Sequence, residues 1–320
     1  MMAAEHTAPD LMGQLPGVRG SYEPYAVLAP TTWFRVGGPA EVLYTPADTE
    51  DLATFLRGKP DNVPVTIIGL ASNLLIRDGG IPGVTIKLGR AFNTIEADGT
   101  TVRCGGSAVD ASVATAARDK GIAGLEFLTG IPGTVGGVVR MNAGAYGREI
   151  QDILISATAI DDTGKLHKLS REDLGFSYRH CATPSDWVFI GAEFKGIEGD
   201  SEEITNRIRE IRAEREDAQP VQSRTGGSTF ANPPEAKAWE LIDRAGCRGL
   251  IRGGAAVSEK HCNFLINTGT ATASDLEGLG DEVRRRVLEV TGIPLTWEIR
   301  RVGVAATDDK APLGRAGGAA

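Results

Sequence analysis

The sequence predicts an α+β fold in which short strands and scattered helices are joined by many glycine-containing turns. Glycine supplies 41 of the 320 residues, about 13%, where an average protein has about 7%. A β-branched run at residues 63–69 indicates a buried strand, whereas the chain from residue 84 onward has the pattern of a meander of short strands. Frequent tight turns between such strands favour an irregular α+β protein over a helical bundle.

The first region, residues 1–83, is predicted to form a small β–α–β–turn–β unit. Asp48 or Thr49 can cap its helix, because a short polar side chain at this position accepts a hydrogen bond from the first helical turn. The segment after the buried strand, Leu70-Ala71-Ser72-Asn73, has the composition of a turn. The expected elements are strands at 31–40 and 42–45, a helix at about 48–58, and strands at 63–69 and 74–76.

Residues 84–217 are expected to form a second region, with one Ala-rich helix that ends at Gly121. The turn Asp162-Thr163-Gly164 predicts a β-hairpin. The last element is a strongly charged helix at 201–217, with Ser201 as its N-cap and three isoleucines on one face. The other expected elements are strands at 85–88, 94–97 and 101–105, a helix at 110–120, hairpin strands at 153–161 and 165–169, a turn or short helix at 170–174, and strands at 176–178 and 188–195.

A third region, residues 218–303, begins where Gln219-Pro220 interrupts the charged helix. Pro234 is a suitable first-turn residue for a helix that ends at Gly246. Thr272 or Ser274 is expected to cap a longer helix, which runs to about residue 291. Strands are expected at 255–257, 264–267 and 295–302. Residues 304–320, rich in Ala, Gly and Asp, are expected to be a disordered tail.

Charge and hydropathy exclude several classes of protein. The net charge is −8, which argues against a basic nucleic-acid-binding surface. No apolar run is long enough to span a membrane, and the N-terminal residues lack the basic and apolar regions of an export signal. The four cysteines form no CxxC pair, so we expect reduced thiols and no metal site. These features predict a cytoplasmic protein without a nucleic-acid or membrane partner.

Two glycine-containing loops are candidates for a phosphate-binding site. Residues 125–147 include six glycines and carry no charge between Glu126 and Arg140. Such a segment either wraps backbone amides around an anion or forms a pair of tight turns between strands. The segment Gly69–Asn73 either presents amides, Ser72 and Asn73 to a pyrophosphate or is an ordinary turn. Neither GxGxxG nor a P-loop occurs in the chain. The presence of two such loops therefore favours a dinucleotide that is bound without a Rossmann fold.

Seven blocks along the chain resemble one family of enzymes. They are TTWFRVGGPA, IIGLASNLLI, GLEFLTGIPGTVGGVVRMNAGAYG, FSYRHC, RTGGSTFANP, VSEKHCNFLIN and LTWEIRRVG, in this order. Together they are similar to the UDP-N-acetylenolpyruvoylglucosamine reductases, flavoenzymes of peptidoglycan precursor synthesis in cell-wall formation. The resemblance spans about residues 25–303. The short spacing between blocks resembles the form of the family that lacks an extra tyrosine-bearing substrate loop.

The resemblance implies a two-part FAD-binding domain of the PCMH or vanillyl-alcohol-oxidase type, at 1–83 and 84–217. It also implies a C-terminal α/β substrate-binding domain at 218–303. FAD would be bound noncovalently, NADPH would be the hydride donor, and the monomer would reduce the enolpyruvyl ether of UDP-N-acetylglucosamine to UDP-N-acetylmuramate. The implied FAD-binding residues are Gly69, Ala71, Ser72, Asn73, Thr129, Gly130, Pro132, Gly133 and Gly136.

Three residues match catalytic positions of the family. Arg179 would stabilise negative charge on the substrate, Ser228 would donate a proton, and Glu298 would assist. From the residues alone, the pattern favours ordinary roles: Arg179 as a surface ion-pair partner, Ser228 as a turn residue, and Glu298 as a member of a solvated strand face. Further polar residues are candidates to bind the substrate diphosphate and sugar, namely Arg224, Asn232, Lys260 and His261.

Two positions depart from the family pattern. Ala71 stands where glycine is more common, so either this position is not left-handed or the turn is altered. Cys181 stands where serine is more common, which weakens any hydrogen bond made there.

Two other functions remain open on the residues alone. One is a flavin oxidase of the same fold that uses O2; the histidines lie outside both glycine loops, which argues against a histidine-linked flavin. The other is a nonenzymatic protein that binds a flavin or a nucleotide sugar. The serine in RTGGSTF favours an enzyme, and bleaching of the flavin by NADPH distinguishes the three.

Overall fold

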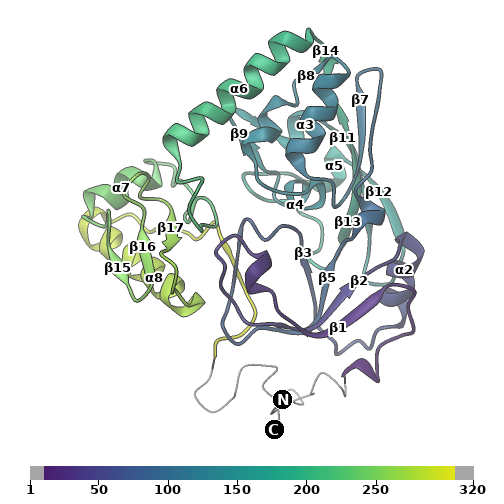
Figure 1. Cartoon of the computed structure of the whole chain (residues 1–320), viewed down its shortest axis with the longest axis horizontal. Coiled ribbons are helices and arrows are strands. Elements are labelled where there is room, and N and C mark those ends of the chain that lie inside the picture. Colours follow the sequence, from purple (N-terminus) through teal and green to yellow (C-terminus); the bar gives the residue numbers. More distant parts are fainter. Residues whose placement is uncertain (1–10, 307–320) are drawn as a thin grey trace. The chain divides into compact units, whose positions relative to one another are not determined.

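The structure, a computed structural model, describes residues 11–306 and divides into two compact units (Figure 1). Unit 1 contains the residues up to Pro24, Val42–Leu70 and Gly83–Arg215. Unit 2 contains Tyr25–Glu41, Ala71–Pro82 and the residues from Glu216. Each unit is therefore assembled from separate stretches of chain. The contiguous domains at 1–83, 84–217 and 218–303 remain predictions, and the predicted tail lies outside the described residues from 307 onward.

The first sheet has the strand order β1-β2-β5-β3, and its β5–β3 pair is parallel. Its strands are β1 (Ser21–Ala26), β2 (Ala40–Thr45), β5 (Ile81–Lys87) and β3 (Val65–Ile68). The predicted helix is present as α2 (Thr49–Gly58), where the Asp48 side chain accepts from the Asp51 N–H. Tyr44 and Phe55 are fully buried with ring centroids 4.6 Å apart. Their contact fixes α2 on the sheet.

The second sheet of unit 1 is antiparallel, with the order β12-β11-β13-β7-β6. The hairpin β11–β12 confirms the turn predicted at Asp162-Thr163-Gly164, and Ser170 caps α5 as part of a capping box. The helices α3 and α4 contact this sheet. The bounds are β6 (Ile95–Asp98), β7 (Thr101–Gly105), α3 (Asp110–Asp119), α4 (Val135–Arg140), β11 (Leu154–Ile160), β12 (Leu166–Ser170), α5 (Arg171–Leu174) and β13 (Val188–Lys195).

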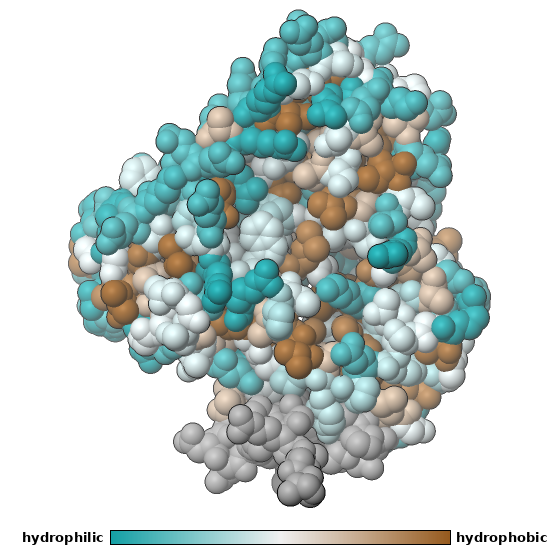
Figure 2. Space-filling model, in the orientation of Figure 1, coloured by the Kyte–Doolittle hydropathy of each residue, from teal (hydrophilic) through white to brown (hydrophobic). Residues whose placement is uncertain are grey.

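Two small two-stranded sheets and a long helix complete unit 1. The isoleucine face predicted for α6 (Ser201–Ala218) is buried, and its other face is hydrophilic in Figure 2. The predicted cap was wrong: Asp200 Oδ1 accepts from the N–H groups of Glu202 and Glu203, while Ser201 Oγ donates to the Arg118 carbonyl. One strand pair is a hairpin of β9 (Gly144–Ala145) with β10 (Arg148–Glu149), and the other joins two distant strands, β8 (Ile122–Ala123) and β14 (Ile197–Glu198). Short 3-10 turns are η2 (Arg90–Phe92), η3 (Glu126–Gly130) and η4 (Ile150–Asp152).

Unit 2 combines a three-stranded antiparallel sheet with two helices and a parallel strand pair. The predicted cap of α8 is Thr272, whose hydroxyl accepts from the Asp275 N–H. The apolar side chains of α7 and α8 share one buried cluster with the sheet. The bounds are η1 (Ala29–Thr31), β4 (Leu74–Ile76), α7 (Ala238–Arg244), β15 (Ile251–Arg252), β16 (Ala255–Val257), β17 (Leu265–Asn267), α8 (Ala273–Thr291) and β18 (Arg300–Val302).

Several predicted elements were wrong, for local reasons. Residues 32–39 form no strand, because Arg35 and Gly37 have φ of +58° and +113°. The helix expected at Pro234 begins at Ala238, the final strand is confined to β18, and 176–178 contribute a single bridge. The glycine-rich stretch contains the helix α4, which the sequence did not indicate.

Within residues 11–306, no helix has both the length and the apolar character needed to cross a membrane. The same residues contain no group of three His, Cys, Asp or Glu side chains placed to hold a metal ion.

Candidate active site

The segment that carries Ser228 follows two glycines with separate structural reasons. A Cβ at Gly226 would overlap the ring of the buried Phe34. Gly227 has a φ of +83°, in the left-handed region that favours glycine. Ser228 is half-buried directly after this turn. Packing on one side and the left-handed turn on the other thus fix the path of the chain at Ser228.

Backbone hydrogen bonds join this segment to the one that carries Glu298. The Glu298 N–H donates to the Thr229 carbonyl at 2.9 Å. One residue further, Phe230 and Trp297 form an antiparallel bridge, and their ring centroids lie 5.1 Å apart. The structure therefore brings the backbones at Ser228 and Glu298 together, although 70 positions separate them in the sequence.

Asn73, a predicted FAD-binding residue, is tied to the same segment. Its Nδ2 donates to the Glu298 carbonyl at 3.2 Å, and its own carbonyl accepts from the Arg300 N–H at 3.1 Å. The parallel pairing of β4 with β18 continues this connection. Within unit 2, one half of the loop at 69–73 is thereby held beside a candidate catalytic residue.

Asn263 holds the Ser228 segment from another side, and the sequence analysis did not identify it. Its side-chain oxygen accepts from the Phe230 N–H at 3.0 Å, and its Nδ2 donates to the Phe230 carbonyl at 2.8 Å. Its backbone carbonyl accepts from the Thr229 N–H at 2.8 Å. An asparagine between Cys262 and Phe264, in a block of apolar residues, was the available signal for a buried polar clamp.

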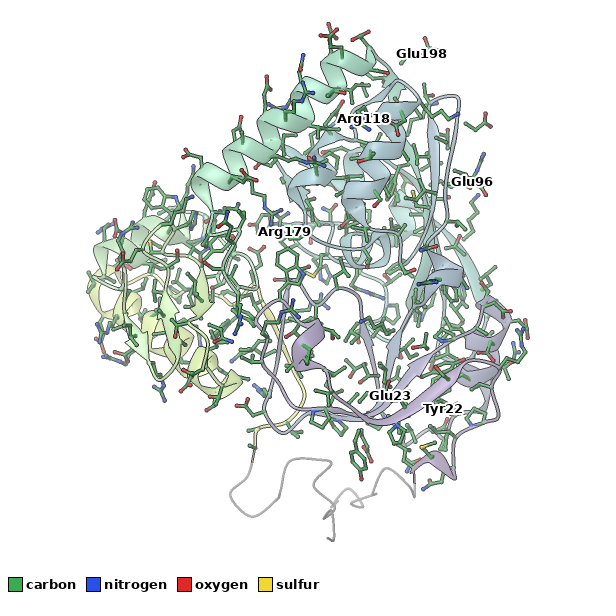
Figure 3. All side chains as sticks on the ribbon, viewed as in Figure 1. Tyr22, Glu23, Glu96, Arg118, Arg179 and Glu198 are labelled. Atoms are coloured by element: carbon green, nitrogen blue, oxygen red, sulfur yellow. The ribbon has the colours of Figure 1, made fainter. Side chains whose placement is uncertain are left out.

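Arg179 lies in unit 1, in the tight turn closed by a bridge between Ser177 and His180 (Figure 3). Its φ is +53°, a strained value for a residue with a side chain. Its Nη2 donates to the Gly144 carbonyl at 2.8 Å, and its guanidinium lies 4.9 Å from the centroid of the Tyr178 ring. The surrounding structure therefore holds the backbone of this turn, and the contacts with Gly144 and Tyr178 hold the guanidinium.

The two glycine-containing loops meet within unit 1. A Cβ at Gly69 would lie 2.7 Å from the hydroxyl oxygen of Thr134. At Gly136 a Cβ would lie 2.9 Å from the Phe189 carbonyl, and the Gly136 N–H donates to the Gly106 carbonyl at 2.8 Å. The Gly136 amide is thus used by the fold, and this glycine is explained by close packing.

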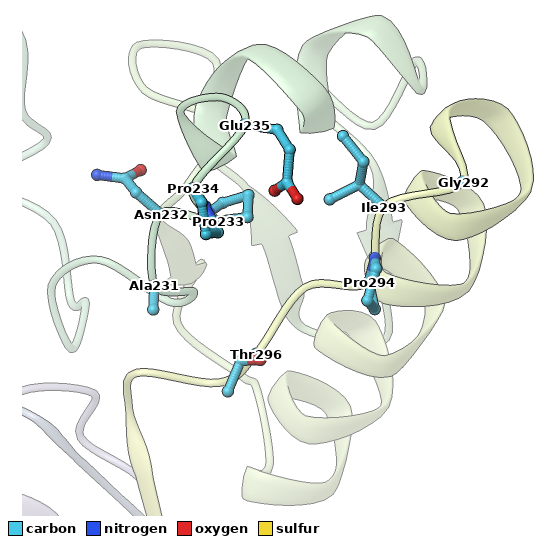
Figure 4. A pocket seen from close by; sticks show the side chains of 9 residues that line it. All are labelled: Ala231, Asn232, Pro233, Pro234, Glu235, Gly292, Ile293, Pro294 and Thr296. Carbon is cyan, nitrogen blue, oxygen red and sulfur yellow. The ribbon is translucent and has the colours of Figure 1, made fainter.

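The four predicted substrate residues lie in unit 2 and differ in their surroundings. Arg224 is exposed, whereas Lys260 donates to the Glu216 carbonyl at 2.5 Å. Burial lowers the pKa of His261, whose Nδ1 is buried without a partner. Asn232 lines a pocket of about 460 Å³ at the N-terminal side of α7, but its side chain points away from the pocket and its oxygen accepts from the Ala238 N–H (Figure 4).

Comparisons with known proteins identify the family of the chain. A family model described as the FAD binding domain matches residues 40–170, and one described as the UDP-N-acetylenolpyruvoylglucosamine reductase C-terminal domain matches residues 219–302. The chain is 59% identical to the UDP-N-acetylenolpyruvoylglucosamine reductase of Parvibaculum lavamentivorans, over 95% of this chain and 98% of the relative. It is 57% identical to that of Rhodospirillum rubrum, over 95% and 97%.

The chain belongs to the UDP-N-acetylenolpyruvoylglucosamine reductase family. The crystal structure of the family member from Thermus caldophilus matches with a TM-score of 0.78 and 34% identity, over 90% of this chain and all of that one. The predicted fold class, an α+β FAD-binding domain followed by a substrate-binding domain, is confirmed.

The loops fit the diphosphate of an FAD as the family membership requires. A Cβ at Gly69 would meet the Thr134 hydroxyl, so the two loops pack directly against each other at this glycine. Residues 129–137 carry no charged side chain, and the groups they offer are backbone amides and threonine hydroxyls. Asp110 lies beside Gly133, and burial raises its pKa well above the usual range.

Replacing Ala71 with glycine is expected to stabilise the protein. Ala71 is buried with a φ of +52°, so this position is left-handed and the alternative that it is not left-handed is wrong. Relief of this strain outweighs the added conformational freedom of glycine in the unfolded chain. We therefore expect the free energy of unfolding to rise by roughly 0.5–1 kcal/mol. Urea unfolding measures it. The control variant Ala97→Gly, at an ordinary strand position in β6, should destabilise the protein. Equal losses of stability in both variants would show that Ala71 is not strained.

Replacing Asp110 with asparagine is expected to remove a pH dependence of stability. Both Asp110 carboxyl oxygens are buried without a partner, and burial raises the pKa. The folded state therefore binds more protons than the unfolded state between the ordinary pKa and the raised one, so the contribution of Asp110 to stability falls as pH rises through this window. The advantage of Asp110→Asn over the wild type should be larger at pH 8 than at pH 5 in urea unfolding. The control variant Asp98→Asn changes an exposed carboxylate, and its stability relative to the wild type should not depend on pH in this way. If Asp110→Asn were more stable than the wild type by the same amount at both pH values, the prediction would be wrong.

Proposed function

We propose that Arg179, Ser228 and Glu298 carry out the proton-transfer half of the family reaction in this chain. As a member of the family, the chain is an FAD-containing oxidoreductase that uses NADPH to reduce the enolpyruvyl ether of UDP-N-acetylglucosamine to UDP-N-acetylmuramate, in peptidoglycan precursor synthesis. Bound FAD would supply the redox chemistry, the transfer of a hydride from NADPH to C3 of the enolpyruvyl group. The observation that supports these roles best is the backbone ladder between the Ser228 segment and Glu298.

Arg179 is proposed to bind the substrate carboxylate. A guanidinium can hold a carboxylate through two parallel hydrogen bonds, and it stays charged at every working pH. When C3 gains a hydride, negative charge develops at C2 and spreads into the carboxylate. A positive group held in place by surrounding contacts stabilises that charge without moving during the reaction.

Ser228 is proposed to donate its hydroxyl proton to C2, and Glu298 to assist. A serine is a weak acid in water, so it donates efficiently only to a strong base such as the carbanion-like C2. Glu298, in its protonated form, can donate a hydrogen bond to the same charge-rich group. The direct connection between the two segments keeps both side chains on a common backbone frame.

The remaining polar residues are proposed to bind the rest of the ligands. Arg224, Lys260 and His261 would contact the nucleotide sugar. The residues that would contact FAD are Gly69, Ala71, Ser72, Asn73, Thr129, Gly130, Pro132, Gly133 and Gly136. Asn232 supports the start of α7 through its oxygen, which leaves its amide for the substrate. The buried free thiols suit the reducing cytoplasm. A monomer remains a prediction, as do roles in cell shape and division.

One absorbance experiment tests the proposed function. The purified protein should show an oxidised-flavin spectrum that NADPH bleaches without oxygen, and anaerobic addition of the enolpyruvyl substrate should restore it. Restoration by O2 alone, with no response to substrate, would identify an oxidase. A flavin that NADPH does not bleach would identify a binding protein.

A further inference from the structure

We propose that Glu149 is a positioning residue that orients the Arg179 guanidinium for the substrate half-reaction. Its Oε1 lies 3.6 Å from Arg179 Nη1, in an ion pair whose side chains are 26% and 23% exposed. This inference rests on the proposed role of Arg179. Glu149 lies just after the glycine-rich stretch 125–147, whose last residues the phosphate-binding interpretation does not use.

The other oxygen of Glu149 is held by two amide side chains. Asn142 Nδ2 donates to Oε2 at 2.9 Å, and Gln151 Nε2 donates to the same atom at 2.8 Å. Asn142 is fully buried, and its own oxygen accepts from the Gln151 N–H at 3.0 Å. The carboxylate therefore has one oxygen fixed by neutral donors and the other directed to Arg179.

The same amide group also holds the turn on which Arg179 stands. Asn142 Nδ2 donates to the Ser177 carbonyl at 3.1 Å, and Ser177 closes the turn with His180. Gly144, which accepts from Arg179 Nη2, is the register partner of Glu149 in the β9–β10 hairpin. Both the backbone of Arg179 and its guanidinium are thus anchored to a single hairpin.

The contacts of Glu149 are better suited to orient the Arg179 guanidinium than to stabilise the fold. A partly exposed ion pair contributes little to folding, typically about 0–1 kcal/mol. A fixed negative charge beside a guanidinium instead defines which of its N–H groups are directed to the substrate. Loss of that charge leaves Arg179 at least as attractive to a carboxylate, but less well directed.

The decisive variant is Glu149→Gln, which keeps the size of the side chain and an acceptor for Asn142 while it removes the charge. We expect unchanged FAD content, melting temperature and rate of flavin reduction by NADPH. Flavin reoxidation by the enolpyruvyl substrate should slow by about 10–100-fold, the effect of a small misplacement of a catalytic group. The KM for this substrate should stay the same or fall. Glu172→Gln, which removes an exposed acid from α5 of the same unit, should behave as the wild type.

A double variant shows whether Glu149 acts through Arg179. Glu149→Gln should have no further effect on reoxidation when Arg179 is already alanine, whereas independent roles would make the two losses multiply. Wild-type kinetics in Glu149→Gln, independent losses, a KM that rises in proportion to the loss, or a drop in FAD content or melting temperature would each overturn the proposal. A wild-type enzyme that the substrate does not reoxidise would instead overturn the proposed function.

Discussion

Replacing Ser228 with alanine is expected to leave flavin reduction by NADPH intact and to slow reoxidation by the substrate by about 10²–10⁴-fold, the usual worth of a positioned general acid. The substitution removes a single oxygen from a half-buried side chain. The local backbone is set by Gly226, Gly227 and the bonds of Thr229, so the fold should tolerate it. Stopped-flow absorbance measures the two half-reactions separately.

The matched control for this experiment is Ser223→Ala, the same chemical change five positions earlier in the same loop. Both variants should keep FAD, and Ser223→Ala should keep both half-reactions. Reoxidation of Ser228→Ala at the wild-type rate would remove Ser228 from the mechanism. Equal slowing in both variants would indicate that the loop as a whole, rather than the Ser228 hydroxyl, controls the reaction.

Local sequence patterns predicted most helices and strands, because the relevant interactions are short in range. The cap at Asp48, the capping box at Thr272 and the turn between β11 and β12 are each determined within a few residues. The same patterns failed at residues 31–40, where Gly38 bonds to Arg77. That contact stabilises a looped conformation, and its partner lies too far along the chain for a local pattern to indicate it.

The candidate site shows the same limit at the level of side chains. The motifs located the three proposed catalytic residues, but they did not indicate what holds them. Asn263 and Asn142 act through bonds to backbone segments about 33 and 35 positions away. The pairing of Glu298 with Thr229 likewise depends on tertiary contacts. The sequence therefore indicated the groups that could perform the chemistry, whereas the structure was required to identify the groups that position them.

Replacing Gly69 with alanine is expected to lower FAD affinity by about 10–100-fold, since overpacking by one methyl group typically costs 1–3 kcal/mol. The new methyl would lie 2.7 Å from the Thr134 hydroxyl, while the other two nearest atoms, both of Thr134, lie 3.9 Å away. The clash thus involves a single oxygen. It is relieved by moving the two loops apart, which separates the groups that would surround the FAD diphosphate.

Because one atom causes the clash, a second substitution can remove it. Gly69→Ala combined with Thr134→Ala should bind FAD about as tightly as Thr134→Ala alone, since the obstructing oxygen is absent. Gly69→Ala combined with Thr134→Val should remain weak, because a methyl group replaces the hydroxyl at a similar distance. Flavin fluorescence titration of the apoprotein gives the dissociation constants. Unchanged affinity in Gly69→Ala would show that contact between the loops does not shape the FAD site, and equal rescue by alanine and valine would show that the Thr134 hydroxyl is not the obstruction.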